Sequence, residues 1–307
     1  MQVLVTGGAG FIGSHVLELL QGKAQVTVLD NLTSGSRSHI PTGMEFVEGD
    51  VRDAAVVETV FAHKHFDAVI HLAAQTLVPD SIANPVLDCQ INLEGLLHIL
   101  ENCRKYQVSH VLFSSSAAVY GDNPNIPLLE TETLQPLSPY GITKMTSEHY
   151  LRVYHELYGI NATVFRFANV YGERQGEKGE GGVISIFCRL LSEDQGVTIY
   201  GDGSQTRDFV YAGDIAQAIV AALPLTGLHC MNVSTGKETS LQCLLESFRQ
   251  AVGHSFPIHY APPRTGDILR SVLSNERLKL TLRMEPAMEL SEGIARTYAW
   301  YKAQYEK

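Results

Sequence analysis

Short apolar runs alternate with amphipathic stretches through the first half of the chain. The runs QVLVT, QVTVLD, FDAVIHLAA, HVLFSSS and ATVFRFA have the length and composition of buried strands. Residues 84 to 105 and 140 to 157 place apolar side chains three and four positions apart, which predicts amphipathic helices. Because strands that alternate with helices form βαβ units, we expect an α/β fold, a doubly wound parallel sheet with helices on both faces.

Beyond residue 168 this alternation becomes irregular. A charged, glycine-rich segment, ERQGEKGEGG, and a turn-rich segment, YGDGSQTRD, separate shorter elements. This pattern predicts a smaller, irregular α/β domain built on the end of the sheet. We therefore expect two interleaved domains, residues 1-168 and 169-307.

Charge and composition exclude several classes of function. The 33 acidic and 23 basic residues give a formal net charge of -10, which favours neither nucleic acid nor an anionic membrane as a partner. The five cysteines include no CxxC pair, as in a reduced, cytoplasmic protein. The N-terminal run lacks a basic signal region, and no apolar run is long enough to span a membrane. His63 and His65 have no further ligand at a useful spacing, so no metal site is expected.

A glycine-rich segment, VLVTGGAGFIGSH, follows the first strand directly and opens a helix. Its glycines fit two registers: GxGxxG with Gly8, Gly10 and Gly13, or GxxGxxG with Gly7 in place of Gly8. Glycine suits a tight turn in which the backbone touches a pyrophosphate and the helix packs closely on the strand. The N–H groups at the helix N-terminus then attract the phosphates. The segment predicts a dinucleotide-binding loop.

The end of the second strand indicates which dinucleotide binds. Asp30 closes VTVLD about twenty residues after the loop. A carboxylate there accepts hydrogen bonds from both ribose hydroxyls of adenosine and repels a 2′-phosphate. Because Asn31 and Leu32 follow, and no arginine, the sequence favours NAD over NADP.

A tyrosine and a lysine stand four positions apart in SPYGITK, after a strand that ends in three serines. On a helix, Tyr140 and Lys144 project from one face, so the ammonium would lie near the phenol oxygen. A neighbouring cation lowers the pKa of a phenol toward neutral pH. Such a tyrosinate takes the proton from an alcohol while a hydride leaves for the nicotinamide, and a serine hydroxyl holds the same oxygen.

The order and spacing of several motifs resemble one family along nearly the whole chain. TGGAGFIGSH, LDNLTSG, GDVRD, HLAAQ, SSSAAVYG, SPYGITK, FRFANVYG, GDGSQTRDFVY and PRTGDILRSV are similar to those of the extended short-chain dehydrogenase/reductases, and within them of the UDP-glucose 4-epimerase branch. The resemblance implies catalytic roles for Ser116, Tyr140 and Lys144. It implies NAD contacts from Gly7, Gly10, Phe11, Ile12, Gly13, Asp30, Asn31, Asp50, Val51, Leu72, Ala73, Ala74, Tyr140 and Lys144. It implies UDP-sugar contacts from Ser116, Asn169, Val183, Arg207, Arg264, Asp267 and Ser271.

The resemblance implies NAD-dependent C4 epimerisation of a UDP-hexose through a 4-keto intermediate, by a homodimer that pairs helices near 84 to 105 and 140 to 157. Related dehydratases and decarboxylases carry acidic residues where this chain has Ala117 and Ala118. A UDP-glucuronate 4-epimerase stays open, although Pro79 replaces an arginine found in many relatives. The small Ser271 leaves room for N-acetylated sugars, while Ala168 replaces a common phenylalanine. A non-catalytic NAD-sensing protein should lack the tyrosine or the lysine.

Overall fold

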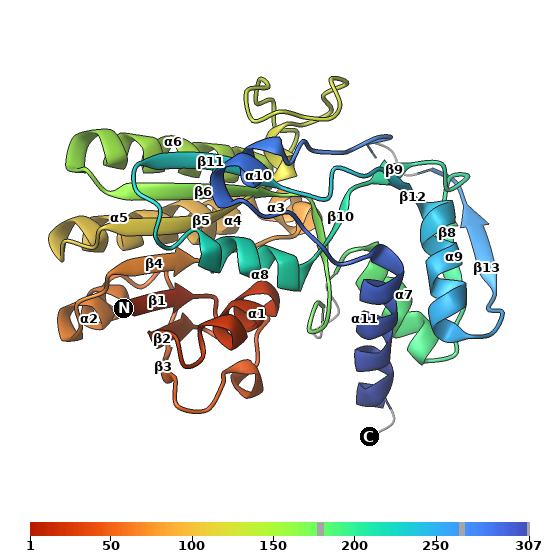
Figure 1. Cartoon of the computed structure of the whole chain (residues 1–307), viewed down its shortest axis with the longest axis horizontal. Helices are drawn as coiled ribbons and strands as arrows, with labels where there is room; N and C mark the ends of the chain where they lie inside the picture. The colour runs from red at the N-terminus through yellow and green to blue at the C-terminus, as the bar shows by residue number, and fades with distance from the viewer. Residues whose placement is uncertain (177–180, 264–267, 306–307) are drawn as a thin grey trace. The chain divides into compact units, whose positions relative to one another are not determined.

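The computed structural model describes residues 1–176, 181–263 and 268–305 (Figure 1). Its strands are β1 (Gln2–Thr6), β2 (Gln25–Asp30), β3 (Glu45–Glu48), β4 (Ala68–His71), β5 (His110–Ser116), β6 (Asn161–Phe167), β7 (Asn169–Tyr171), β8 (Val197–Tyr200), β9 (Thr206–Arg207), β10 (Phe209–Tyr211), β11 (Leu228–Val233), β12 (Thr239–Ser240) and β13 (Ile258–Ala261). Its α-helices are α1 (Phe11–Leu20), α2 (Ala54–His63), α3 (Val78–Ala83), α4 (Pro85–Cys89), α5 (Gly95–Lys105), α6 (Pro139–Tyr158), α7 (Val183–Ser192), α8 (Ala212–Ala221), α9 (Leu241–Val252), α10 (Glu276–Leu282) and α11 (Leu290–Tyr305). Short helical turns are η1 (Arg37–His39), the π-helical η2 (Gln90–Glu94) and η3 (Ala117–Val119).

Seven strands form one sheet in the order β11-β6-β5-β4-β1-β2-β3. All neighbours from β6 to β3 pair in parallel. The chain builds outward from β1 through β2 to β3 and then returns to place β4 on the other side of β1. This reversal makes the carboxyl end of β1 the point where a doubly wound sheet opens a crevice for a ligand. The expected α/β fold is confirmed.

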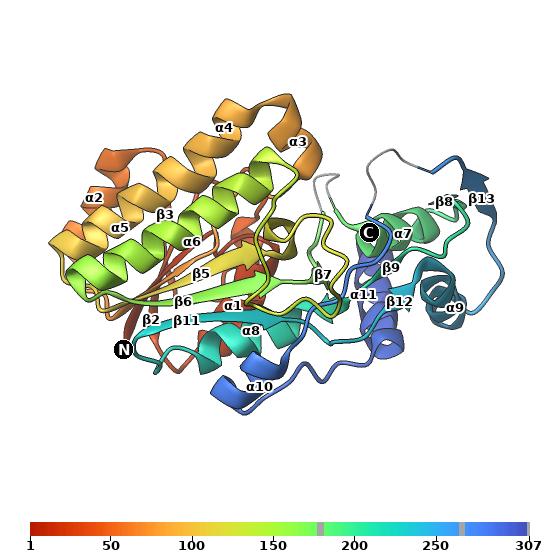
Figure 2. The same ribbon diagram turned by 90° about the horizontal axis from the view of Figure 1, so that it is seen from above.

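Helices cover both faces of this sheet. Helices α2, α5 and α6 lie side by side on one face, and α1 lies on the other (Figure 2). The first group buries a continuous apolar core against the strands, in which Phe61 of α2, Leu100 of α5 and Leu151 of α6 are at most 1% exposed. Because both faces are covered, the central strands are apolar on both sides, as the runs QVLVT and FDAVIHLAA predicted.

Both long helices expected from apolar spacing are present. Residues 140 to 157 lie within α6, whose N-cap is Ser138 and which ends at Gly159 with a φ of 71°. Its N-cap hydroxyl accepts a hydrogen bond from the N–H of Gly141, and Pro139 at the first helical position needs no donor partner. Residues 84 to 105 continue from α4 into α5 through the π-helical turn η2.

The contacts divide the chain into two compact units. The first unit contains residues 1–123, 130–167 and 216–231, and the second contains 124–129, 168–215 and 232–307. In the second unit α11 packs against both α7 and α9, with Phe187, Phe248 and Ile294 in the core between them. Small two-stranded sheets complete this unit. None of the helices in the described ranges is long and apolar enough to cross a bilayer.

Candidate active site

The polar residues singled out in the first unit lie at the carboxyl ends of neighbouring strands. Thr6 ends β1, Asp30 ends β2, His71 ends β4 and Ser116 ends β5. Since these strands are parallel, their carboxyl ends meet at one edge of the sheet. The reversal of strand order at β1 lies in the middle of this edge, so the sequence motifs converge on the place where this fold binds ligands.

The turn after β1 requires glycine at two of the expected positions. Gly7 has a φ of 70°, and a Cβ there would lie 2.5 Å from the amide nitrogen of Ala73. A Cβ on Gly13 would lie 2.2 Å from the carbonyl oxygen of Gly7. Gly8 has no such φ, and its close neighbour is the side chain of Val28 at 2.8 Å. The turn therefore uses the GxxGxxG register, and Gly8 serves the packing of the loop on β2.

The N-terminus of α1 is suited to a pyrophosphate. Its N-cap is Gly10, which offers no side-chain hydrogen bond to the first N–H groups of the helix. Phe11 and Ile12 are half-buried and Gly13 is buried, so backbone rather than side chain is presented at this turn. A ten-residue helix with such an N-terminus attracts anionic groups. The glycine cradle and this helix end fit the phosphates of a dinucleotide.

Asp30 is fixed beside the glycine loop. Its carboxylate accepts hydrogen bonds from the N–H of Ala9 at 3.0 Å and from the N–H of Leu32 at 2.8 Å. The side chain is 7% exposed, so these backbone donors offset much of the cost of burying the charge. A carboxylate held in this way beside the loop fits the ribose of NAD, although its contact with NAD stays a prediction.

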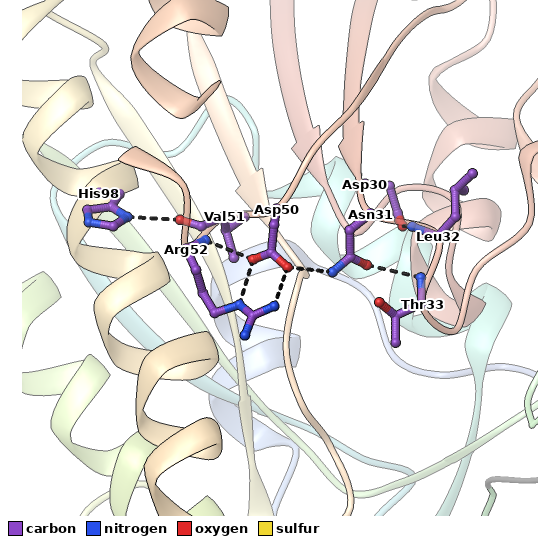
Figure 3. Close-up of polar contacts among 8 residues, drawn as sticks. All are labelled: Asp30, Asn31, Leu32, Thr33, Asp50, Val51, Arg52 and His98. Carbon is purple, nitrogen blue, oxygen red and sulfur yellow. Dashed lines mark hydrogen bonds and ion pairs between the residues drawn. The ribbon is translucent and has the colours of Figure 1, made fainter. Parts of the chain in front are cut away.

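The expected adenine-binding residues form a polar chain of their own (Figure 3). Asp50 accepts hydrogen bonds from Nε and Nη2 of Arg52 and, at 2.8 Å, from Nδ2 of Asn31. The hydrogen bonds from Arg52 lower the pKa of the Asp50 carboxyl to about 2 against the opposing effect of burial. Val51 is 4% exposed, and its carbonyl lies 3.0 Å from Nδ1 of His98. Asp50 and Val51, which follow β3, thereby connect the end of β2 to α5.

The segment after β4 lies against the glycine loop. The N–H of Leu72 donates to the carbonyl of Thr6 at 3.0 Å, and the N–H of Ala73 donates to its Oγ1 at 3.3 Å. Leu72, Ala73 and Ala74 are half-buried. These contacts hold the segment after β4, which is predicted to contact the cofactor and is called the cofactor segment below, against the end of β1.

His71 is a neutral structural histidine. Its Nδ1 lies 2.7 Å from Oγ1 of Thr6, and its ring stacks on Phe113. Burial, assisted by the nearby charge of Lys144, lowers the pKa of His71 to about 3. Among the described residues Nε2 has no hydrogen-bond partner. The imidazole therefore carries no charge at neutral pH.

The structure gives three different surroundings to the three serines that end β5. Ser114 donates to the carbonyl of His71 at 3.3 Å, and Ser115 donates to Glu148. Ser116 is half-buried, and its Oγ accepts from the N–H of Ala118 at 3.2 Å. Because a hydrogen bond from Ser116 acts on the pKa of Tyr140, these two hydroxyls are neighbours. Ser116 is thus the serine placed to share a substrate oxygen with the tyrosine.

Tyr140 and Lys144 lie one turn apart at the start of α6, as expected. The Nζ atom of Lys144 lies 5.8 Å from the centre of the Tyr140 ring and 4.8 Å from that of Phe113. It donates to the carbonyl of Ser114 at 2.8 Å. The lysine is 2% exposed and the tyrosine 9%. The helix thereby buries both groups against the end of β5.

The direction of the pKa shift of Tyr140 corrects one expectation. Burial raises the pKa of Tyr140 to about 12, the hydrogen bond with Ser116 opposes this, and the charge of Asp88 adds to it. Burial also lowers the pKa of Lys144 to about 8, so the ammonium itself is destabilised. Helical spacing from a lysine therefore does not by itself lower the pKa of this phenol, because desolvation of the phenolate is the largest influence on it.

Besides Ser116, the described residues predicted to contact the sugar-nucleotide lie in the second unit. Arg207 lies in β9, next to Asp208, whose carbonyl accepts from the N–H of Asn169 in β7 at 2.9 Å. Thr206 bridges to Arg270, which precedes the half-buried Ser271. Asn169, Arg207 and Ser271 therefore belong to one group of neighbouring segments. Val183 begins α7 and packs on the core of that unit. Arg264 and Asp267 lie outside the described residues.

A buried polar cluster beside Tyr140 was not found by motif. Asp88 of α4 is 1% exposed and accepts hydrogen bonds from Gln75, Asn92 and Thr143. In the sequence Asp88 stands in an amphipathic helix pattern, where a carboxylate normally faces solvent. The available signal was a polar residue three positions after Pro85 on the apolar side of that helix.

Comparisons with known proteins show the family of this chain. Residues 3–233 match the model of the family described as "NAD dependent epimerase/dehydratase family". A UDP-glucose 4-epimerase from Thermotoga maritima, crystallised with UDP-glucose, is 38% identical with a TM-score of 0.96, over 99% of this chain and 100% of that one. A Thermus thermophilus UDP-glucose 4-epimerase in complex with NAD is 41% identical with a TM-score of 0.92, over 98% and 99%. A Methanobrevibacter ruminantium UDP-N-acetylglucosamine 4-epimerase, in complex with UDP-N-acetylmuramic acid, is 35% identical with a TM-score of 0.93, over 99% and 98%. Because the family model matches residues 3–233 and these relatives are 35% to 41% identical over nearly the whole chain, this chain belongs to the NAD-dependent epimerase/dehydratase family.

Proposed function

We propose that this protein is an NAD-dependent 4-epimerase of UDP-hexoses, with UDP-glucose and UDP-galactose as substrates. The observation that carries the proposal is the group formed by the half-buried Ser116 at the end of β5 and the buried Tyr140 and Lys144 of α6, together with a loop shaped for a dinucleotide. The names of full-length relatives at 35% to 41% identity support this choice of reaction. Residues 1-168 would bind NAD and residues 169-307 the UDP-sugar.

In the proposed reaction Tyr140 acts as its tyrosinate and takes the proton of the C4 hydroxyl, while Ser116 holds the same oxygen. NAD, when bound, would accept the hydride from C4 and return it to the other face of the resulting 4-keto sugar. The glycine loop and Asp30 would fix the cofactor, and Lys144 would donate to its ribose. Returning the proton from Tyr140 to the C4 oxygen completes the inversion, so the protein ends in its starting protonation state.

The proposal assigns the anchoring of UDP to the second unit. Asn169 and Arg207 would contact the diphosphate together with Arg264, and Asp267 would contact the uridine ribose. An arginine suits a diphosphate because its planar donor fork pairs with two oxygens. Val183 would line the same site. Holding the diphosphate while leaving the sugar free to turn lets either face of C4 meet the cofactor.

The chain lacks the groups that two related reactions need. Dehydration or decarboxylation requires an additional acid or base near C5 and C6, and the residues directly after Ser116 are Ala117 and Ala118. A UDP-glucuronate 4-epimerase would need a cation for the substrate carboxylate, and the chain has Pro79 where many relatives carry arginine. These observations favour neutral hexoses as substrates.

The sugar range is a second part of the proposal. Ser271 is small and half-buried, and it would leave room for the N-acetyl group of UDP-GlcNAc and UDP-GalNAc. The relative from Methanobrevibacter ruminantium is named for the N-acetylated sugar. Turnover of UDP-galactose without any turnover of UDP-GalNAc would overturn this part alone.

A product assay tests the proposed reaction. The purified protein is incubated with UDP-glucose, UDP-galactose, UDP-GlcNAc, UDP-GalNAc and UDP-glucuronate, each without added cofactor, and products are identified by NMR. We expect inversion at C4 of the hexoses. A 4-keto-6-deoxy sugar, a pentose, or no change in any substrate contradicts the proposal.

We also propose that the protein is a cytoplasmic homodimer. Exposed apolar side chains gather on α3, α4 and α6, and they are Ile82, Val86, Ile142, Val153 and Leu157. Apolar side chains exposed on neighbouring helices are typical of a protein interface. Two copies of the chain would cover these helices by pairing them with each other.

A further inference from the structure

A closed network of hydrogen bonds surrounds the carboxylate of Asp88 beneath the catalytic helix. Oδ1 accepts from Nε2 of Gln75 at 3.0 Å and from Nδ2 of Asn92 at 3.1 Å. Oδ2 accepts from Oγ1 of Thr143 at 2.9 Å. Gln75 belongs to the segment after β4, Asn92 to the π-helical turn η2, and Thr143 to α6. Asp88 therefore joins the predicted cofactor segment to the residue next to Lys144.

The orientation of the two amides favours an ionised Asp88. The N–H of Gln75 donates to Oδ1 of Asn92 at 2.9 Å, so Nδ2 of Asn92 faces the carboxylate. The N–H of Leu77 donates to Oε1 of Gln75, so Nε2 of that side chain is a donor as well. Both amides thus donate to Oδ1, which suits a carboxylate because it only accepts. Burial raises the pKa of Asp88, and the hydrogen bond from Thr143, the charge of Lys144 and the hydrogen bond from Gln75 oppose this.

Lys144 needs a negative partner, because its ammonium is buried. The carboxylates that act on it are those of Asp88 and Glu148. Glu148 is already neutralised, because Arg166 donates to it from Nε at 3.0 Å and from Nη2 at 2.7 Å. The side chains of that pair are 6% and 9% exposed. Asp88, whose donors are all uncharged, is the carboxylate that remains to balance Lys144.

We propose that Asp88 is a positioning residue for the reaction: its carboxylate balances the charge of the buried Lys144 and fixes α6 against the segment after β4. Asp88 acts through Lys144 and touches neither substrate nor cofactor in this role. The inference rests on the proposed function only in giving Lys144 a task in catalysis.

Other titratable groups lie around Asp88 and Lys144 and also affect the charge of these two side chains. Helix α6 contributes Tyr140 and Glu148, β6 contributes Arg166, and β4 contributes His71, which is neutral. The carboxylate of Asp88 raises the pKa of both Lys144 and Tyr140. Removing its charge should therefore lower both pKa values, whereas a purely structural role of Asp88 would move neither.

The test uses Asp88→Asn, which keeps the shape and an acceptor oxygen for Gln75 and Asn92 but removes the charge. The Cε resonance of Lys144 in the full-length protein, labelled with ¹³C-lysine and assigned with a Lys144→Arg variant, reports its titration directly. We expect the midpoint to fall by about one pH unit in Asp88→Asn. Both limbs of the pH profile of UDP-galactose turnover should move to lower pH. Asp80→Asn, an exposed neighbour in α3, is the control and should leave midpoint and profile unchanged.

An unchanged Lys144 midpoint in folded Asp88→Asn overturns the inference, whatever happens to turnover. If turnover is absent already in the wild type, the proposed epimerisation fails while the NMR titration still decides the role of Asp88. Should Asp88→Asn not fold, Lys144→Met provides the reciprocal measurement on the ¹³C-carboxyl resonance of Asp88. Loss of the cation must raise the midpoint of Asp88, and an unchanged midpoint contradicts the inference.

Discussion

At the scale of single residues, burial decides the chemistry more strongly than spacing does. Tyr140 and Lys144 lie one helical turn apart, as the sequence indicates. Burial nevertheless raises the pKa of Tyr140 and lowers the pKa of Lys144, so it favours the neutral form of each side chain. The charge of Asp88 favours the protonated form of both. Tyr140 therefore holds its proton firmly in the protein alone, and its work as a base depends on what the complete site adds.

Tyr140→Phe removes one hydroxyl from this group and tests its role. The variant should fold and retain NAD, because the ring still fills its buried place, and turnover should fall at least ~100-fold if proton transfer is lost. Turnover is measured on UDP-galactose, and NAD in the purified protein by absorbance after release. Tyr150→Phe, an exposed tyrosine on the same helix, serves as the matched control. Turnover of Tyr140→Phe within a few-fold of wild type would exclude the tyrosine as the base.

His71 gives the fold a stability that depends on pH. The pKa of His71 falls from 6.5 to about 3 on folding. Between these two pH values the imidazole binds a proton in the unfolded chain but not in the folded protein. Stability is therefore fully present above the unfolded value and is lost as the pH falls toward 3, by on the order of 2 kcal/mol between pH 7.5 and pH 5. Urea unfolding at both values should show that His71→Asn loses less stability on acidification than wild type. An equal loss in both proteins would show that His71 does not contribute.

At the scale of elements, the spacing of apolar residues predicted both long helices, and one of the two contains a π-helical turn that the spacing does not predict. The helix predicted for 140 to 157 is α6, because its apolar spacing, Ser138 and Gly159 all agree. The stretch from 84 to 105 is broken by the π-helical η2. Apolar spacing does not reveal a single π turn, and here that turn directs Asn92 toward Asp88 and Gln75.

The loop between β1 and α1 provides a prediction at this scale. Gly13→Ala places a Cβ 2.2 Å from the Gly7 carbonyl, so the turn must open, and we expect a loss of about 1–3 kcal/mol together with loss of bound NAD. Gly22→Ala at the end of α1 meets nothing within 4 Å but has a φ of 73°, so it should cost stability and retain NAD. Thermal unfolding and NAD content of both variants check this. Equal retention of NAD by the two would contradict the role given to Gly13.

At the scale of the whole molecule, the chain order and the spatial units differ. The chain passes from the first unit to the second after Phe167, and residues 216–231 return to the first unit and supply most of β11. The run LHCMNV was not expected to be a strand. It joins the edge of the sheet beside β6 through pairing with residues far away in sequence, which a local pattern does not encode.

The proposed dimer is tested at this scale. Val86 is 66% exposed on α4 and Val153 is 39% exposed on α6. Replacing both with Glu should convert a dimer into a monomer, because two paired copies would bury four unpaired carboxylates. Light scattering coupled to size exclusion measures the mass, and Glu58→Gln on α2 is the control. A wild-type mass of one chain, or a double variant that stays dimeric, contradicts this arrangement.

The sequence by itself determined the central strands of the sheet, the glycine loop, the carboxylate at the end of β2 and the Tyr140–Lys144 pair, because each depends on local spacing along one or two elements. The tertiary structure decided which of three serines neighbours the tyrosine, which way the pKa of Tyr140 moves, and that Asp88 stands behind Lys144. These features depend on burial and on contacts between α4, the segment after β4 and α6. Their residues are distant in sequence and meet only when the helices pack on the sheet, so no local pattern carries them.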